Sequence, residues 1–359
     1  MIIPVKRRIG IEEEFLLVDP TTGQSRRNGP DIAAAAEEQT ELQRQQVETG
    51  TDPHTDLSDV LADLTSRRTR TAALAEKQGT RLLALATHPL PTTPDLTPGA
   101  RYERLSQEYG LLAREQLTCG CHIHVEVPDR DEAAAVLDRI RPWTAVLLAL
   151  STNSPYWQGQ DSGYASYRAQ VWDRWPTAGP TETFGDAAGY DTHTARLLAT
   201  GVPLDPGQLY FDARISATQP TVEIRVADVC LRARDAVLLA ALTRALVETA
   251  AREASDGHPV PDVSVAELRA ASWRAAHDGL GGVLISPHTG RPAPAADVVI
   301  ALLDHISPAL RDASDDDFVA AGLAQVHQRG TGADWQRNTA DALGPAEMIT
   351  QAVELTRST

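Results

Sequence analysis

Lysine is almost absent from this chain of 359 residues, in which Lys6 and Lys77 are the only two. Nearly all of the positive charge is therefore carried by arginine, and the phosphate-binding motif G-x-x-x-x-G-K-[ST] is missing. The net charge of −16 argues against a nucleic-acid partner, because binding along a phosphate backbone needs a basic surface. A phosphate group bound by this chain would have to be held by arginine, backbone N–H groups or metal ions.

Cysteine and long apolar runs are also scarce. The cysteines Cys119, Cys121 and Cys230 are too few for a disulfide framework, and the C-x-C pair lacks the second ligand pair of a typical zinc site, so we expect reduced, packed thiols. No stretch of 18 apolar residues is present, which argues against a membrane span. The sequence starts without the apolar segment of a signal peptide, and we therefore expect a cytoplasmic protein.

The first predicted strand, residues 9–18, combines β-branched and large apolar residues with three carboxylates in its middle. Side chains alternate between the two faces of a strand, so Glu12 and Glu14 share one face and Glu13 lies on the other. Two carboxylates side by side repel each other and are costly to bury unless a cation holds them. The pair therefore indicates either a solvated face or a site for a hard metal ion.

Two later strands, at 120–127 and 221–228, alternate in the same way. One face of each strand is apolar. The opposite faces carry the following side chains: His122, His124, Glu126, Glu223 and Arg225. Carboxylates with an occasional histidine are typical ligands of Mg²⁺ or Mn²⁺ rather than of zinc. Together with arginine and no P-loop, they favour nucleotide phosphate held through metal ions.

The order of the elements predicts an α+β fold with a mainly antiparallel, curved sheet, helices packed on its back and a polar, concave front. We expect a single domain over residues 1–359, rich in strands up to residue 230 and helical from 231 onward. Expected helices before that point are 55–78, 100–117 and 129–150. Residues 153–180 are rich in Trp, Tyr, Gly and Arg, which is typical of a segment that covers a ligand.

Five motifs in the same order resemble the carboxylate–amine ligase family, also called glutamate–cysteine ligase type 2. They span most of the chain. The motifs are GIEEEF at 10–15, CGCHIHV at 119–125, the loop from SPYW at 154–157 to GYASYR at 163–168, TVEIRVAD at 221–228 and GTGADWQR at 330–337. The resemblance implies a glutamine-synthetase-like fold.

The resemblance also implies a reaction and its ligands. ATP would phosphorylate the γ-carboxylate of glutamate, and an amine would displace phosphate to give a γ-glutamyl amide. The Mg²⁺ (or Mn²⁺) ligands would be Glu12, Glu14, Glu41, Glu48, His122 and Glu223. Arg225, next to Glu223 on the same face, would neutralise the phosphoryl group in transfer. The substrates would be small molecules, and the resemblance makes a homo-oligomer plausible.

Two features depart from the family pattern. Glu41 and Glu48 are seven residues apart, so a continuous strand would place them on opposite faces. Either a bulge intervenes, or Glu41 precedes the strand, or Glu48 alone is a ligand. The family also has an arginine before the Gly-Tyr of the loop, which is missing here, and we expect Arg168 to bind the α-carboxylate of the substrate instead.

The loop from Trp157 to Arg168 is the predicted lid, which would protect an acyl phosphate from water. Within it, Trp157 and Tyr164 are expected to contact substrate or ATP, as are His124 and Arg337. Cysteine is the expected acceptor, with another amine as the alternative. Two other classes of function stay open: a phosphotransferase acting on a guanidine, and a sensor of glutamate or nucleotide without catalysis.

Overall fold

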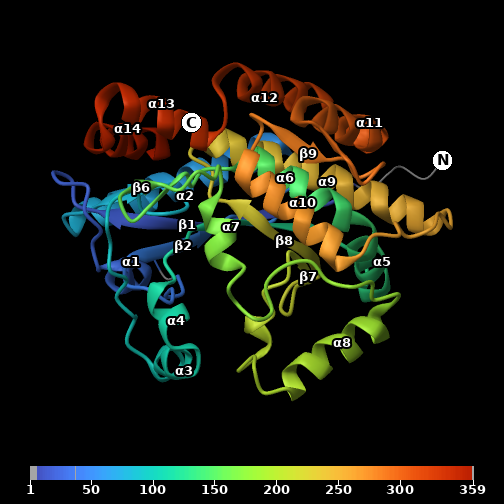
Figure 1. Ribbon diagram of the computed structural model, residues 1–359, viewed down its shortest axis with the longest axis horizontal. Coiled ribbons are helices and arrows are strands. Elements are labelled where there is room, and N and C mark those ends of the chain that lie inside the picture. Colours follow the sequence, from blue (N-terminus) through green and yellow to red (C-terminus); the bar gives the residue numbers. More distant parts are fainter. Residues whose placement is uncertain (1–5, 37, 358–359) are drawn as a thin grey trace.

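A six-stranded antiparallel sheet lies at the centre of the protein. The computed structural model describes residues 6–36 and 38–357 (Figure 1). Five strands follow the order β2-β1-β4-β8-β7, and β3 also pairs with β1. All of these pairings are antiparallel. The strands are β1 (Ile9–Val18), β2 (Gln46–Gly50), β3 (Arg81–Leu83), β4 (Gly120–Glu126), β7 (Ala213–Ile215) and β8 (Thr221–Asp228).

Long helices cover the apolar face of this sheet. Ile11 of β1, Ile123 of β4 and Ile224 of β8 belong to one buried cluster with residues of α9. The helices α10, α11 and α12 form a further layer against α6 and α9 (Figure 1). The helices of these layers are α2 (Leu57–Lys77), α5 (Arg130–Ile140), α6 (Thr144–Ser151), α9 (Ala233–Ser255), α10 (Val265–Asp278), α11 (Ala295–Ala313) and α12 (Asp316–Arg329).

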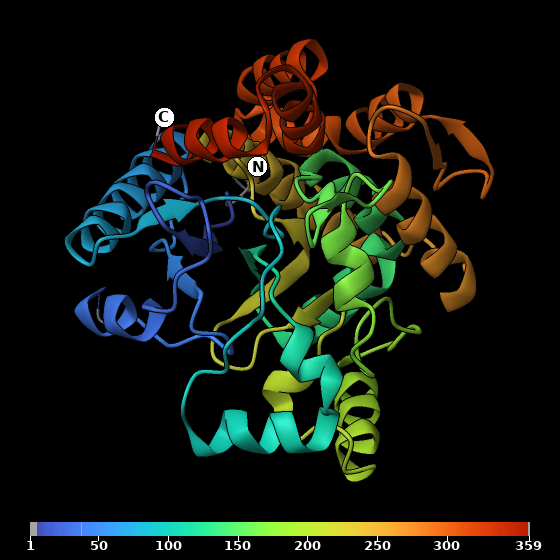
Figure 2. The ribbon, with the colours of Figure 1, turned by 60° about the vertical axis from the view of Figure 1, so that its left-hand side comes forward.

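Shorter elements surround the opposite, polar face and one end of the sheet. In Figure 2 the α3 and α8 helices lie at the far side of the molecule from α11 to α14. The α14 helix packs on β3 and α2. These elements are α1 (Gly29–Ala36), α3 (Ala100–Tyr109), α4 (Leu111–Glu115), α7 (Tyr167–Trp172), α8 (Ala187–Ala199), α13 (Gly332–Leu343), α14 (Pro345–Arg357), the 3₁₀ turns Arg141–Trp143 and Pro206–Gln208, and the hairpins β5 (Tyr156–Trp157) with β6 (Gln160–Asp161) and β9 (Val283–Ile285) with β10 (Pro292–Pro294).

Glu13 finds its partner on the helical side of the sheet. Arg68 of α2 donates two hydrogen bonds to this carboxylate, at 2.8 Å from Nε and 2.6 Å from Nη2. Both residues are buried, with 0% and 1% of their surface exposed. Arg68 also donates to the backbone carbonyls of Cys230, Leu231 and Thr356. The Arg68 side chain therefore links α2 to β1, to the segment at residues 230–231 and to the end of α14.

The α+β prediction is confirmed, while several helix bounds differ from it. The helix expected over 100–117 is divided at Gly110, whose φ of +57° is unfavourable for other residues. The helix expected over 129–150 is interrupted by the 3₁₀ turn around Pro142, whose ring cannot continue the α-helical bonding. The three thiols are buried and unpaired, as expected. Over the described residues, no helix is long and apolar enough to cross a membrane.

The structure also settles the uncertain segment 41–49. β2 begins at Gln46, so Glu48 lies in the strand and Glu41 precedes it, which is one of the three alternatives left open by the seven-residue spacing. Before residue 231, three further helices, α1, α7 and α8, were not expected. Two of them begin at side-chain caps: Ser166 accepts from the Ala169 N–H before α7, and Asp186 accepts from the Gly189 N–H before α8.

Candidate active site

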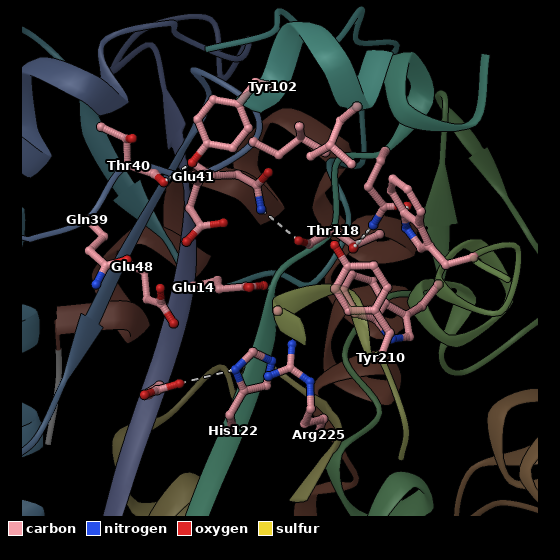
Figure 3. A pocket seen from close by; sticks show the side chains of 18 of the residues that line it. Glu14, Gln39, Thr40, Glu41, Glu48, Tyr102, Thr118, His122, Tyr210 and Arg225 are labelled. Carbon is pink, nitrogen blue, oxygen red and sulfur yellow. Dashed lines mark hydrogen bonds and ion pairs between the residues drawn. The ribbon is translucent and has the colours of Figure 1, made fainter. Parts of the chain in front are cut away.

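A cavity of about 610 Å³ opens on the polar face of the sheet. Its floor is built by β1, β2, β4 and β8, and its walls by α3, α7 and the segments before and after them (Figure 3). Six of the predicted site residues line it: Glu12, Glu14, Glu41, Glu48, His122 and Arg225. Strand register explains most of this grouping, because Glu12 stands opposite His122 and Glu14 opposite Glu48.

The carboxylates and imidazoles gather into three overlapping groups. In each group the possible ligand atoms lie within 4.8 Å of one another. The groups are Glu14 with Glu41 and Glu48, Glu12 with Glu48 and His122, and Glu12 with His124 and Glu223. The set thus contains all six of the ligands that the family resemblance implied, together with His124.

Two carboxylates of these groups have raised pKa values, and a bound cation would lower them again. Burial, together with the charge of Glu14, raises the pKa of Glu41 to about 7. Burial and the charge of Glu41 raise the pKa of Glu48 well above its usual range. Glu12 behaves differently: burial acts to raise its pKa, but hydrogen bonding to His122 and His124 lowers it below the usual range. Charges of one sign are thus concentrated on one side of the cavity.

Backbone and side-chain contacts hold two of these ligand candidates in place. The Gly120 N–H donates to Glu14 Oε2 at 2.6 Å, which fixes that carboxylate at the start of β4. His122 Nδ1 lies 3.4 Å from Glu12 Oε2, and His122 Nε2 is buried without a hydrogen-bond partner among the described residues. Burial and the nearby Arg225 lower the pKa of His122, which favours the neutral imidazole.

Arg225 faces these groups from β8, and Glu223 holds it there. The Arg225 guanidinium contacts Glu223, which in turn accepts two hydrogen bonds from Arg214, at 2.7 and 3.1 Å. Burial acts to raise the pKa of Glu223, but the charges of Arg225 and Arg214 lower it to about 2. Arg214 of β7 stands directly opposite Glu223. Sequence reasoning missed it, although the alternation Ala213-Arg214-Ile215 places it on the polar face.

A second cavity of about 340 Å³ lies beside the first. The two share Glu12, Glu38 and Gly50 in their linings. His124 belongs to the second cavity, where its Nδ1 lies 2.9 Å from the hydroxyl of Thr221 and its Nε2 lies 3.3 Å from Glu12 Oε1. Arg8 and Arg67 also line this space. Glu12 therefore lies where a larger cavity lined by carboxylates and aromatic rings meets a smaller cavity lined by Arg8, Arg67 and His124.

Aromatic rings that sequence reasoning did not select form the other side of the larger cavity. The Trp172 and Tyr210 rings have centroids 4.8 Å apart, and Trp175 meets Tyr210 at 5.5 Å. Trp175 is fixed by a hydrogen bond of 3.1 Å from its Nε1 to Gln116. Tyr102 of α3 completes this lining. The signal in the sequence was the W-x-x-W spacing at 172–175 within the Trp- and Tyr-rich segment.

Comparisons with known proteins agree with this geometry. Residues 8–354 match the family model described as glutamate-cysteine ligase family 2. The chain belongs to this family. It is 49% identical over 351 residues to a Frankia alni protein provisionally named glutamate–cysteine ligase 2-2, with 92% of each chain covered. It is 47% identical over 360 residues to a Streptomyces avermitilis protein provisionally named glutamate–cysteine ligase 2-1, with 98% of this chain and 99% of the relative covered.

Solved structures of ligases share the fold. The glutamate–cysteine ligase of Francisella tularensis, determined in complex with AMP, superposes with a TM-score of 0.72 and 14% identity, covering 99% of this chain and 89% of that one. A bifunctional glutathione synthetase from Pasteurella multocida gives a TM-score of 0.68 and 15% identity, covering 98% of this chain and 52% of that one. Membership of glutamate-cysteine ligase family 2 makes this chain a ligase that forms C–N bonds between small molecules.

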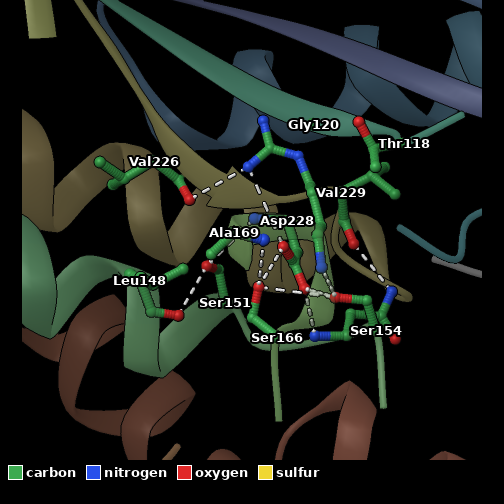
Figure 4. A network of polar contacts seen from close by, with 12 residues as sticks. Thr118, Gly120, Leu148, Ser151, Ser154, Ser166, Ala169, Val226, Asp228 and Val229 are labelled. Atoms are coloured by element: carbon green, nitrogen blue, oxygen red, sulfur yellow. Dashed lines mark hydrogen bonds and ion pairs between the residues drawn. The ribbon is translucent and has the colours of Figure 1, made fainter. Parts of the chain in front are cut away.

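The structure does not bring Arg168 into the cavity of this family member. Its side chain is 2% exposed and donates to the carbonyls of Arg225 and Val226, each at 3.3 Å. Asp228 lies 4.0 Å away and accepts hydrogen bonds from Ser154 and Ser166 (Figure 4). With its guanidinium bonded to the backbone of β8 and outside the lining of the larger cavity, Arg168 is not placed to bind the α-carboxylate of a substrate.

The remaining predicted contacts also lie outside the linings of both cavities. Arg337 of α13 is paired with Asp161 at 2.7 Å and donates to the carbonyl of Tyr164 at 2.9 Å. The Trp157 and Tyr164 rings both pack against Tyr167. These contacts fasten the predicted lid to α13 and to the start of α7. No contact of these side chains with the cavity supports their assignment to substrate or ATP.

Proposed function

We propose that this protein is an ATP-dependent ligase that converts the γ-carboxylate of glutamate into an acyl phosphate and joins it to an amine. ADP, phosphate and a γ-glutamyl amide would be the products. The observation that carries the proposal is the position of Glu12. It belongs to two of the three groups of possible metal ligands and lies at the junction of two cavities, so that two substrates could meet there.

The residues present fit Mg²⁺ or Mn²⁺. Both ions prefer carboxylate oxygens, with an occasional imidazole, which is the composition of these groups. Burial and the charges of neighbouring carboxylates raise the pKa values of Glu41 and Glu48, and a bound cation would stabilise their ionised forms. Glu12, Glu14, Glu41, Glu48, His122 and Glu223 would hold the ions. When bound, the ions would offset the charge of the ATP phosphates and polarise the phosphoryl group.

Arg225 is the group best placed to act on the phosphoryl group itself. Burial acts to lower the pKa of Arg225, but the charge of Glu223 raises it, so the guanidinium stays charged. Its Nε is buried and has no hydrogen-bond partner within the described part of the chain. The contacts with Glu223 restrict its orientation in advance, which is how charge stabilisation becomes effective in a transition state. Arg214 would act through Glu223 as a positioning residue.

The two cavities would divide the substrates between them. The larger one contains most of the carboxylates and the aromatic rings, and we assign it to glutamate and the amine. The smaller one contains Arg8, Arg67 and His124 beside Glu12, which suits a nucleotide. The γ-phosphoryl group of that nucleotide would extend past Glu12 toward the metal ligands and Arg225 of the larger cavity. The AMP complex of the Francisella tularensis ligase supports an adenine nucleotide as the second substrate.

A coupled assay tests the proposal. Purified protein is incubated with Mg-ATP, L-glutamate and a panel of amines, and ADP and product masses are measured. ADP release that requires both glutamate and an amine, with a γ-glutamyl amide of the expected mass, would support it. A stable phosphorylated product without an amide would indicate a phosphotransferase. AMP with pyrophosphate as products would contradict the acyl-phosphate route.

Substitutions of the possible metal ligands test whether the reaction takes place at these residues. Glu12→Gln and Glu223→Gln keep the side-chain volume but remove the negative charge, and each is expected to lower ADP release at least a hundredfold. Glu76→Gln is the matched control, because Glu76 pairs with Arg81 and Arg357 at the surface. Unfolding temperatures of all variants report whether they are folded. Wild-type activity in Glu12→Gln would remove this residue from the site.

A further inference from the structure

The larger cavity has an aromatic side with no evident role in phosphoryl transfer. In Figure 3 the carboxylates of Glu14, Glu41 and Glu48 lie on one side and the Tyr210 ring on the other. The Trp172 and Tyr210 rings are only partly buried and both line the cavity. Leu105 of α3 lies in the same lining. The Trp172 and Tyr210 planes are tilted by 56° and the Arg225 guanidinium lies 6.0 Å from the Trp172 centroid, so the rings present an angled, partly apolar surface to whatever the cavity binds.

The volume of the cavity exceeds what small amino acids need. Sites of roughly 300–1,000 Å³ typically take ligands of drug size, and this cavity measures about 610 Å³. Glutamate and cysteine are both much smaller than such ligands, and the nucleotide has been assigned to the neighbouring cavity. With glutamate placed against Glu12 and Arg225, the space in front of Trp172 would stay filled with water if the acceptor were cysteine.

The charges of the lining argue against an acceptor with its own carboxylate. Its guanidinium groups are Arg101, Arg214 and Arg225. Arg225 and Arg214 are both held by Glu223. Arg101 pairs with Asp205 at 3.0 Å, and both side chains are well exposed, so this pair can open for one substrate carboxylate. The α-carboxylate of glutamate would occupy it, and a second carboxylate would find no further guanidinium available in this lining.

We infer that the acceptor is an arylalkylamine, whose ring packs on Trp172 and Tyr210 while its amine points toward the glutamyl carbonyl. The inference rests on the proposed function and names its acceptor. The protonated amine first loses one proton to water. Its nitrogen then attacks the γ-carbonyl carbon of γ-glutamyl phosphate, the C–N bond forms, the bond from that carbon to the phosphate oxygen breaks, and the departing phosphate takes the second proton.

Competing acceptors provide the test. With saturating Mg-ATP and glutamate, kcat/KM is measured for 2-phenylethylamine, tyramine, ethylamine, L-phenylalanine and L-cysteine, with product masses. Burial of an aromatic ring predicts that 2-phenylethylamine exceeds ethylamine by about tenfold to a hundredfold. The lack of a further guanidinium predicts that kcat/KM for 2-phenylethylamine also exceeds that for L-phenylalanine. A kcat/KM for L-cysteine equal to or above that of 2-phenylethylamine would overturn the acceptor assignment and leave the ligase proposal intact. Absence of amide with every amine would overturn both.

Substitutions of Trp172 distinguish a loss of packing against the acceptor ring from a general loss of activity or folding. Trp172→Ala is expected to lower the ratio of kcat/KM for 2-phenylethylamine over ethylamine at least fivefold, and Trp172→Phe to restore most of it. Trp273→Ala is the matched control, because Trp273 is 40% exposed on α10 and lies outside the cavity lining. An unchanged ratio in a folded Trp172→Ala variant would refute the proposed ring contact. The wild-type acceptor series tests the proposal even if that variant does not fold.

Discussion

Replacing Glu13 with glutamine should destabilise the protein strongly although the residue lies on the side of β1 that faces away from the cavity. The carboxylate is fully buried and accepts two hydrogen bonds from Arg68, which is also buried. Glutamine keeps the volume and one acceptor oxygen but removes the negative charge. The guanidinium would then remain in the interior without its counter-ion.

The magnitude follows from the contacts. Removing one partner of a buried ion pair typically costs about 3–5 kcal/mol. Arg68 keeps its hydrogen bonds to three backbone carbonyls, which places Glu13→Gln near the lower end, about 3 kcal/mol. Arg68→Met would be worse, because it leaves those carbonyls and the carboxylate unpaired, at about 1–3 kcal/mol for each unsatisfied group. The neighbouring Arg67→Met is the control: its pairs with Asp63 and Asp52 lie near the surface and should contribute about 0–1 kcal/mol.

Urea unfolding, followed by tryptophan fluorescence and by circular dichroism, measures these differences. Coincident unfolding and refolding curves from both probes are needed before free energies are compared. The expected order of destabilisation is Arg68→Met, then Glu13→Gln, then Arg67→Met. If Glu13→Gln were within about 1 kcal/mol of the wild type at an unchanged m-value, the buried pair would not have the role assigned to it.

Two further predictions concern the carboxylate cluster. The folded chain holds a proton on Glu41 up to about pH 7, whereas the unfolded chain releases it near pH 4.5, so the stability of the metal-free protein should fall as the pH rises between these values. MgCl₂ should therefore raise the unfolding temperature more at pH 8 than at pH 5.5, and this difference should be smaller in Glu48→Gln. Equal increases at the two pH values would contradict the prediction. Gly120→Ala would place a Cβ 2.4 Å from Arg168 Nη2, which should lower the free energy of unfolding by about 1–3 kcal/mol. It should also lower glutamate-dependent ADP release by displacing Glu14. In the control Gly281→Ala, the nearest neighbour of the new Cβ is 3.7 Å away, so stability and ADP release should both resemble the wild type.

The polar faces of β1, β4 and β8 were predictable because side chains alternate between the two faces of a strand, and the pairing of β4 with β8 departs from a regular register only between Cys121 and Ile123. A period of two places Glu12 with Glu14 and His122 with His124 without knowledge of the tertiary structure. Their pairing partners then follow from register, as between Glu14 and Glu48. Most of the possible metal ligands could thus be selected from the sequence.

Other parts of the site obey no such rule. Arg214 lies in a strand of only three residues, which is too short for alternation to be convincing. Tyr102, Trp172 and Tyr210 come from three distant segments and meet only because the chain closes around the cavity. Arg168 was assigned to the substrate because it follows the loop in which the arginine of the family pattern is missing. Its burial against backbone carbonyls depends on tertiary contacts that sequence patterns do not report.

The pairing of Glu12 with His122 has a consequence for insertions and deletions. Loss of one residue of β4 ahead of His122 would make every later side chain of the strand change face. The imidazoles of His122 and His124 would then point toward the helices, and Ile123 and Val125 would point into the cavity. Loss of two residues would restore the faces but displace His122 along β1 by roughly 7 Å. The length of β4 is therefore more tightly constrained than the identity of its buried apolar residues, several of which could be exchanged for others of similar volume.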